Sequence, residues 1–408
     1  KLGYLINKMK PAIRQYAVIT ANYWAFTLTD GALRMLVVLY FHQLGYSPLE
    51  IASLFLLYEF CGVITNLIGG WLAAHIGLNK AMHLGLALQI VALCMMLVEP
   101  EQLTIVYVMM AQAVSGIAKD LNKMSAKSSI KLLVPNDAQG KLYQWIALLT
   151  GSKNTLKGIG FFLGGVLLSQ FDFSAAISGM AVALTLVLLV SLSLLREDLG
   201  KATFKPKFTD IFSKSAAVNR LSAARLFLFG ARDIWFVIAL PVFLQEQLQW
   251  QHTSVGAFLA SWVIAYGVIQ AFAPKITGLQ KGNIPDGKTA WFWALALFIA
   301  TLLITGLLAL DWQVEKALIA GLFVFGALFA INSSVHSYLI VAYAQEDGVS
   351  LDVGFYYMAN ALGRLIGTLL SGWIYQSYGL ASCLLSAAIF ILFAMLISHR
   401  LPRHSVVK

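Results

Sequence analysis

Long apolar stretches, separated by short polar connections, follow one another along the whole chain. Each stretch is close to the roughly 20 residues that an α-helix needs to cross a bilayer. The apolar stretches and the breaking residues between them predict twelve membrane-spanning helices, over residues 17–41, 51–74, 81–98, 103–126, 142–169, 174–195, 221–245, 254–273, 289–310, 317–344, 353–376 and 380–398. We therefore predict an all-α polytopic membrane protein.

The composition agrees with this pattern. Hydrophobic residues make up 59% of the 408 residues and charged residues only 12%, whereas a soluble domain has about 25% charged residues. The net charge of +10 could indicate nucleic-acid binding, but the basic residues lie mainly between the spans, where membrane orientation accounts for them. Three single cysteines in apolar segments, Cys61, Cys94 and Cys383, are interpreted as packing residues.

The connections differ in their content of basic residues. If both termini and every connection that follows an even-numbered span lie on one side, that side holds twenty of the 29 Lys and Arg residues, while eight lie within spans and Lys316 alone lies opposite. Basic loops stay in the cytoplasm, so we predict that both termini are cytoplasmic. The full-length apolar run after Arg14 is expected to be the first span rather than a cleaved signal.

The chain also divides into two similar parts. The longest polar connection, residues 196–220, separates six predicted spans from six. A shift of 204 residues places Gln43, Leu44, Tyr46, Ile51 and Tyr58 on Gln247, Leu248, Trp250, Val255 and Trp262. We predict a six-helix bundle over residues 1–195, a cytoplasmic linker over 196–220 and a second six-helix bundle over 221–408, related by an internal repeat.

Ionisable residues inside the spans are few and costly. The bases are Arg34, Lys119, Lys123, Lys153, Lys157, Arg225, Arg232 and Arg364, and the acids are Asp30, Glu59, Asp120 and Asp233. Each base facing lipid would cost about 2.5 to 3.5 kcal/mol, so we expect all of them to face a polar interior with a net charge of +4. Spans three, six, nine and twelve contain none of these residues and are expected to be lipid-facing supports around a central cavity.

Helical spacing places the polar residues of several spans on single faces. Tyr23, Thr27, Asp30 and Arg34 form one stripe, Arg225 and Arg232 are seven residues apart, and pairs or triplets follow at Asn332 and His336 and at Tyr356, Asn360 and Arg364. The predicted substrate-binding residues are Tyr23, Arg34, Lys119, Lys123, Lys153, Lys157, Arg232, Asn332, His336, Asn360 and Arg364.

Each group also has a structural alternative. Lys127 and Lys131 continue the ladder of Lys119 and Lys123 and are expected to extend to lipid headgroups. Arg34 could be neutralised by Asp30 and Arg232 by Asp233, Arg364 could brace a helix, and His336 could serve in hydrogen bonding or in proton transfer. Glycines on the fifth span, Gly151, Gly158, Gly160, Gly164 and Gly165, permit close helix packing, either static or for sliding.

A positively charged interior favours an anionic ligand. Arginine matches phosphate-type oxyanions with two parallel donors. A doubly charged phosphate or arsenate ester fits this interior, whereas sugars or cationic drugs would require aromatic residues or a net negative charge.

Three segments carry a resemblance to a known family: NYWAFTLTDGALRMLVVLYFHQLGYSPLEIA (22–52), GIAKDLNKMSAKSSIKLLVP (116–135) and TGSKNTLKGIGFFLGG (150–165). The chain resembles the bacterial organoarsenical efflux permeases of the major facilitator superfamily. The resemblance implies export of 1-arseno-3-phosphoglycerate across the bacterial inner membrane, with glyceraldehyde-3-phosphate dehydrogenase as the partner that makes this substrate, and hence arsenate resistance. Such a substrate carries roughly 1.5 to 2 negative charges for each oxyanion.

General superfamily motifs are present in part. Gly70, Leu72, Gly77 and Lys80 resemble the signature after the second helix, but Ala74 and Gln112 stand where an acid and an arginine are usual. The usual proton-linked gating network is therefore in doubt, and Asp30, Glu59 and Asp120 are the candidates for a proton site.

Proton exchange is the expected driving force, because no nucleotide-binding loop is present in the sequence. We expect no cofactor and no metal. Uptake of a phosphorylated metabolite is the nearest alternative function. A membrane-embedded enzyme or receptor is a further alternative, although the sequence shows neither a metal cluster nor a nucleophile constellation.

Overall fold

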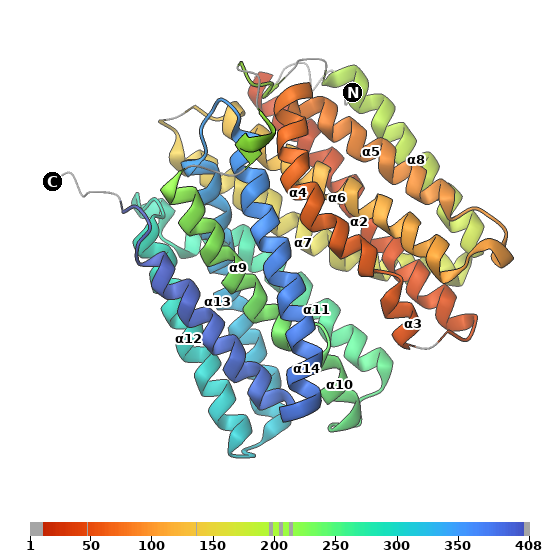
Figure 1. The fold of residues 1–408 in the computed structure, drawn as a ribbon, viewed down its shortest axis with the longest axis vertical. Helices are drawn as coiled ribbons and strands as arrows, with labels where there is room; N and C mark the ends of the chain where they lie inside the picture. The colour runs from red at the N-terminus through yellow and green to blue at the C-terminus, as the bar shows by residue number, and fades with distance from the viewer. Residues whose placement is uncertain are drawn as a thin grey trace. The chain divides into compact units, whose positions relative to one another are not determined.

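A computed structural model describes residues 11–46, 48–135, 137–195, 199–203, 207–211 and 215–403, and its regular structure in these ranges is helical (Figure 1). Parts of the predicted linker, together with Lys1, Lys8, Lys10, Lys205, Lys214 and Lys408, lie outside the described residues.

The described helices cover all twelve predicted spans, so the predicted fold class is confirmed. The long helices are α2 (Pro11–Gln43), α4 (Leu56–Ile76), α5 (Leu78–Met95), α6 (Ile105–Leu133), α7 (Gln139–Gln170), α8 (Phe173–Leu194), α9 (Ala216–Phe236), α11 (His252–Ile276), α12 (Gly287–Ala309), α13 (Val314–Tyr343) and α14 (Val349–Ser398). The short ones are α3 (Pro48–Ser53), α10 (Ala239–Glu246), η1 (Pro100–Gln102), η2 (Phe208–Ile211) and η3 (Leu279–Lys281). Gly379, with φ 76°, divides α14 and accounts for the last two spans.

Two spans differ from the prediction because each is built from two helices. The second span consists of α3 and α4, and the seventh consists of α9 and α10. Pro241 lies in the first turn of α10, where a residue without an N–H group is tolerated. At the start of the same helix, the Ala239 N–H donates to the Ser371 hydroxyl at 3.1 Å. The Ser371 hydroxyl thus accepts a hydrogen bond from a backbone N–H that has no partner within its own helix at this break.

Nine helical segments among the described residues are long and apolar enough to cross a membrane. The helices α6 and α7 are not among them, although each has the required length. Their charged residues lower the hydropathy, since α6 contains four lysines and α7 contains three. These two helices therefore need polar surroundings within the protein.

The chain forms two compact units that do not follow the sequence halves strictly. Unit 1 comprises Lys1–Leu142, Ser152–Phe212 and Ala344–Met358, and unit 2 comprises Tyr143–Gly151, Ser213–Tyr343 and Ala359–Lys408. The helices α7 and α14 thus each contribute to both units. The boundaries predicted from the sequence stay a prediction.

In unit 1, α2 packs against α6 and α8, α4 packs against α5 and α6, and α5 packs against α8 (Figure 1). The core between these helices contains the fully buried residues Leu36, Leu86, Leu93 and Ile177. Burial of such side chains stabilises the helix packing through close van der Waals contact.

In unit 2, α11 and α12 pack against α13, and α9 and α10 pack against each other (Figure 1). The core is rich in aromatic residues. Trp235 lies edge-on to Phe325 with ring centroids 5.0 Å apart, and Trp262 stacks on Tyr266 at 5.6 Å. Such pairs add directional stabilisation to the apolar burial.

Glycines allow α7 to approach α2 closely, as predicted. A Cβ at Gly160 would lie 2.8 Å from the Leu28 oxygen, and one at Gly164 would lie 2.5 Å from the Ala32 oxygen. The other end of α7 approaches α11 at Gly151, where a Cβ would lie 2.5 Å from the backbone of Ala271. Only glycine permits backbones to come this near.

The same pattern recurs on α14. Gly354 lies against α4, while Gly363 and Gly367 lie against α9, where a Cβ at Gly367 would be 2.5 Å from the Gly230 oxygen. These three glycines each follow a close-packed glycine of α7 (151, 160 and 164) by 203 residues. This offset differs by one residue from the shift that aligned the two halves of the sequence.

Candidate functional site

Three of the four residues of the predicted α2 stripe are buried within unit 1. Tyr23, Thr27 and Asp30 are at most 5% exposed. The Thr27 hydroxyl donates to the Tyr23 backbone oxygen at 2.7 Å. The Asp30 carboxylate accepts a hydrogen bond from the Tyr58 hydroxyl of α4 at 2.8 Å. The stripe therefore contacts α4 at Asp30.

Arg34, the fourth member of the stripe, pairs with an acid of α4. Its Nη2 lies 3.4 Å from Glu59 Oε1. The guanidinium also lies over the rings of Tyr58 and Phe55, 4.5 and 5.0 Å from their centroids. The structure thus pairs Arg34 with Glu59 and Asp30 with Tyr58, whereas the structural alternative from the sequence paired Arg34 with Asp30.

Asp120 on α6 is shared by two lysines. Its carboxylate is 2% exposed and lies 2.5 Å from Lys123 Nζ and 3.7 Å from Lys119 Nζ. Lys119 Nζ also lies 3.8 Å from the Tyr58 ring centroid. One negative charge therefore faces two positive charges, and the Tyr58 ring joins this cluster to the one around Arg34.

The expectation that Lys127 and Lys131 extend to lipid headgroups is wrong. Their side chains are only 3% and 7% exposed. Lys127 Nζ lies 5.0 Å from the centroid of the Tyr357 ring, and Lys123 Nζ lies 4.5 Å from it. The first turns of α14 cover this end of α6, which sequence spacing does not reveal.

Lys153 and Lys157 are half-buried on α7. Lys153 Nζ donates to the Asn154 side chain at 3.2 Å, and Lys157 Nζ lies 5.7 Å from the Phe161 ring centroid. The backbone of Lys157 packs against Gly31 of α2, where a Cβ would lie 2.9 Å from the Lys157 oxygen. Close packing against α2 therefore fixes the position of the Lys157 backbone, from which the side chain extends.

In unit 2, Asp233 on α9 is shared by two arginines. The carboxylate is fully buried and accepts from Arg232 Nε at 2.6 Å and from Arg364 Nε of α14 at 3.0 Å. Arg232 and Arg364 are 15% and 28% exposed. Two cations thus share one carboxylate here, as they do at Asp120.

Arg225 lies two turns before Arg232 on α9 and is 3% exposed. Its Nε donates to Asn360 Oδ1 at 2.9 Å, and its Nη1 donates to Ser333 Oγ at 3.0 Å. Its guanidinium stacks 3.7 Å from the Phe229 ring centroid. Of the predicted binding residues, Asn360 thus lies in the hydrogen-bond network of Arg225.

Each unit carries an excess of positive charge inside its spans. Unit 1 holds five of the eight bases identified in the sequence and three of the four acids, and unit 2 holds three bases and one acid. The formal balance is therefore +2 in each unit. Positive charges in partly desolvated surroundings attract anions more strongly than they would in water.

The sequence did not single out Tyr58, Phe229 or Tyr357, which form the aromatic surfaces of these clusters. Tyr58 directly precedes Glu59 and Phe229 lies between the two arginines of α9. The helical position of Phe229 could have identified it, because it lies four residues after Arg225 and three before Arg232, and residues three and four apart share a face. Tyr357 could not have been found in this way, since its partners lie on another helix.

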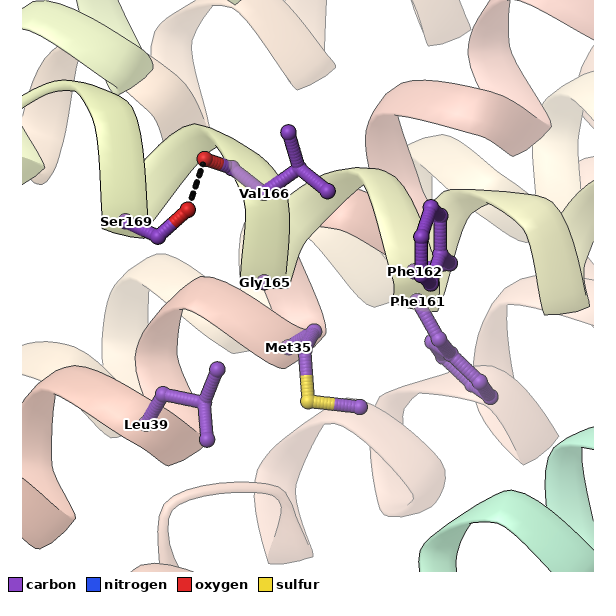
Figure 2. Close-up of a pocket in the computed structure, with 7 residues that line it drawn as sticks. All are labelled: Met35, Leu39, Phe161, Phe162, Gly165, Val166 and Ser169. Carbon is purple, nitrogen blue, oxygen red and sulfur yellow. Dashed lines mark hydrogen bonds between the residues drawn. The ribbon is translucent and has the colours of Figure 1, made fainter.

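A shallow apolar groove of about 310 Å³ lies between α2 and α7 (Figure 2). Its lining is Met35, Leu39, Phe161, Phe162, Gly165, Val166 and Ser169. The Ser169 hydroxyl donates to the Val166 backbone oxygen at 2.8 Å, so it too is satisfied within the helix. The groove presents no charged side chain to a ligand.

The apolar spanning helices and the basic clusters held inside each unit define a multi-pass membrane transporter. The sequence profile of the Major Facilitator Superfamily matches residues 19–283 and 221–407. The chain therefore belongs to the major facilitator superfamily, and its fold is that of a secondary transporter.

Solved structures with little sequence identity share this fold. The human organic anion transporter MFSD10 (TETRAN) is 15% identical with a TM-score of 0.75, over 96% of this chain and 100% of that one. The transporter FucP in its outward conformation is 10% identical with a TM-score of 0.74, over 97% and 100%. A bacterial homologue of the iron transporter ferroportin is 11% identical with a TM-score of 0.74, over 96% and 98%. No curated protein sequence matches the chain.

Proposed function

We propose that this transporter exports an anionic organoarsenical, 1-arseno-3-phosphoglycerate, by alternating access and thereby confers arsenate resistance. The observation that carries the proposal is the sharing of one buried carboxylate by two cations, at Asp120 in unit 1 and at Asp233 in unit 2. The formal charge of one carboxylate balances one of the two cations that contact it, so each set of three side chains carries a formal charge of +1. This formal excess of positive charge favours the binding of an oxyanion.

The proposed oxyanion-binding residues come from both units. Arg34, Lys119, Lys123, Lys153 and Lys157 lie in unit 1, and Arg232 lies in unit 2. We assign these six side chains to the phosphate and arsenate groups. Tyr23, Asn332, His336, Asn360 and Arg364 complete the proposed substrate-binding set.

The resemblance in residues 22–52, 116–135 and 150–165 supplies the identity of the substrate. The similarity of fold to a human organic anion transporter is compatible with an anionic substrate, although at 15% identity it concerns the fold alone. Transport of other phosphorylated metabolites or organic anions is the second candidate, because the same charge balance would serve them. Glyceraldehyde-3-phosphate dehydrogenase is the proposed functional partner.

Proton exchange is the proposed driving force, which makes the protein an antiporter of the bacterial inner membrane with both termini in the cytoplasm. Asp30, Glu59 and Asp120 are the proposed proton-coupling residues. Each is held by a defined partner, namely Tyr58, Arg34 and Lys123. Protonation of one of these carboxylates would release its partner, which is a direct way to couple proton binding to substrate release.

The test is arsenate tolerance in arsenate-sensitive cells that express the transporter with and without the dehydrogenase. We expect tolerance only when both are present, since the dehydrogenase must first make the substrate. Equal sensitivity in all strains removes the arsenical assignment. Uptake of 3-phosphoglycerate by everted vesicles, with and without an imposed pH gradient, separates export of other phosphorylated anions from import.

A further inference from the structure

Helix α13 contains a buried polar segment in an otherwise apolar helix. Asn332, Ser333, Ser334, His336 and Ser337 all lie within six residues and are at most 1% exposed. The helix as a whole is apolar enough to span a membrane. Polar groups buried in such a helix need hydrogen-bond partners, because burial without hydrogen bonds is unfavourable.

The serines of this segment are satisfied by neighbouring helices of unit 2. Ser333 Oγ accepts from Arg225 Nη1 at 3.0 Å and from Gln270 Nε2 at 3.2 Å. Ser334 Oγ donates to the Gln270 backbone oxygen at 3.3 Å. The segment is therefore well able to form hydrogen bonds to α9 and α11.

Asn332 and His336 differ from these serines. Within the described residues, Asn332 Oδ1 and Nδ2 and both ring nitrogens of His336 have no hydrogen-bond partner. The two side chains are 0% and 1% exposed, and they lie one turn apart on the same face. Four polar atoms are thus left without a partner side by side.

This face of α13 points toward the cationic face of α9. Steps of four, three and four residues join Phe325, Phe329, Asn332 and His336. Phe329 packs 5.0 Å from Phe229, measured between ring centroids. The Arg232 guanidinium lies 5.7 Å from the Phe329 ring.

Ser333, which directly follows Asn332, accepts a hydrogen bond from Arg225 Nη1 at 3.0 Å, so the pair lies on the turn of α13 that Arg225 contacts. Arg225 itself lies against Phe229, the same ring that packs on Phe329. Asn332 and His336 therefore border the cation cluster of unit 2.

The hydrogen-bond donors and acceptors of the two side chains determine which group of a ligand they can bind. An asparagine amide offers two donors and one acceptor, and a neutral imidazole offers one donor and one acceptor. An oxyanion accepts hydrogen bonds only, so it would leave Asn332 Oδ1 without a donor. A hydroxyl group both donates and accepts, and it satisfies atoms of both kinds.

We propose that Asn332 and His336 form a subsite for the uncharged hydroxyl of a hydroxylated, phosphorylated three-carbon acid, beside the cations that bind its charged ends. The proposal rests on the proposed function and adds to it the recognition of the carbon chain. It explains why this neutral pair lies unsatisfied beside arginines. It also makes the transporter select for a hydroxylated acid among anions of equal charge.

The test compares two probes that differ by this hydroxyl alone. Purified protein in lipid nanodiscs is titrated with 3-phosphoglycerate, with 3-phosphonooxypropionate, which has the same carboxylate and phosphate ester but no hydroxyl, and with inorganic phosphate. We expect the wild type to prefer 3-phosphoglycerate by about tenfold or more, because loss of a substrate hydroxyl leaves buried polar groups unpaired. In Asn332→Leu the preference falls below about threefold, while binding of inorganic phosphate is unchanged.

A second measurement distinguishes a ligand site from a structural role. Without ligand, Asn332→Leu should melt at the same or a higher temperature than the wild type, since it removes two unsatisfied atoms. Ser333→Ala, which removes a bond to Arg225, should melt lower. A lower melting temperature of Asn332→Leu would overturn the proposal.

The outcomes distinguish failure of the hydroxyl subsite from failure of the proposed function. Equal affinity of the wild type for both three-carbon probes overturns the hydroxyl subsite and leaves an anion transporter in place. Absence of binding by all three probes overturns the proposed function itself, and the subsite with it.

Discussion

Thr203 donates two hydrogen bonds to Asp347, 144 residues away along the chain. Its N–H lies 3.0 Å from one carboxylate oxygen, and its hydroxyl contacts the other. Thr203 lies in the linker segment 199–203, which is fixed to the last turn of α4, because the Ala202 N–H donates to the Ala74 oxygen at 2.9 Å. Asp347 lies just before α14. The linker therefore holds the start of α14 within unit 1, beside the position where the usual motif acid is replaced by Ala74.

This contact predicts that joining Thr203 to Asp347 stops transport. The start of α14 belongs to unit 1 and the remainder to unit 2, so a movement of one unit relative to the other must bend α14 or release its first turns. We expect a short reducible thiol reagent to link Thr203→Cys and Asp347→Cys and to lower transport by about tenfold or more in proteoliposomes, with recovery after reduction.

The cysteine experiment requires a background without Cys61, Cys94 and Cys383, and each single cysteine variant serves as its control. Full transport by completely cross-linked protein would show that this end of α14 stays in place throughout the cycle.

Gly160 should tolerate no side chain. A Cβ there would lie 2.8 Å from the Leu28 oxygen and 3.1 Å from the Gly31 Cα. These are backbone atoms, which cannot move aside cheaply. We expect Gly160→Ala to destabilise the protein by about 1–3 kcal/mol, as overpacking does, and to lower its abundance and melting temperature in detergent.

The matched control is Gly165→Ala on the same helix, where a Cβ would meet only the Leu39 side chain at 3.8 Å. This variant should be as stable as the wild type or slightly more so, because alanine favours the helix. Equal melting temperatures of the two variants would contradict the close packing of α7 on α2.

Asp120→Asn should destabilise unit 1. The substitution leaves Lys119 and Lys123, which are 18% and 15% exposed, without the charge that they share. Breaking a fully buried pair costs about 3–5 kcal/mol, and we expect roughly 1–3 kcal/mol here, because solvent screens these partly exposed lysines. Inorganic phosphate should raise the melting temperature of this variant more than that of the wild type, since it replaces the lost negative charge.

The exposed Asp311 provides the control for charge alone. It has φ 51°, a conformation that asparagine accepts well, so Asp311→Asn should melt like the wild type and show no added response to phosphate. An identical phosphate response of both variants would mean that the lysines of α6 do not bind the anion.

The membrane explains why the helices could be predicted from sequence. Backbone groups in lipid must bond within their own segment, so each apolar stretch had one available structure. The breaks inside two spans were missed because they depend on local contacts, such as that of Ala239 with Ser371. The close approaches at Gly160 and Gly164 were expected from the residue type, but the identity of the neighbouring helix was not.

The sequence predicted which residues belong to the candidate site, but not which residues pair with one another. Spacing placed Asp30 and Arg34 on one face, yet Tyr58 and Glu59 of another helix supply their partners. Lys127 and Lys131 were misassigned for the same reason, since α14 covers them and no local pattern reveals it. Helical periodicity reports which residues share a face, whereas the neighbour of that face is decided by tertiary packing.

Replacing Lys153 and Lys157 together by glutamine should abolish transport while leaving the amount of protein in the membrane unchanged. Both side chains are half-buried on one face of α7, and glutamine keeps their length and polarity but removes two positive charges that the proposed oxyanion site requires. Arsenate tolerance and vesicle transport are the measurements, with membrane abundance determined on the same samples. Lys316→Gln, at an exposed position near the start of α13, controls for loss of charge as such and should transport normally. The net charges of the control and the double variant then differ by only one unit. Retention of full transport by the double variant would remove these two lysines from the substrate path and place the oxyanions on Arg34, Lys119 and Lys123 instead.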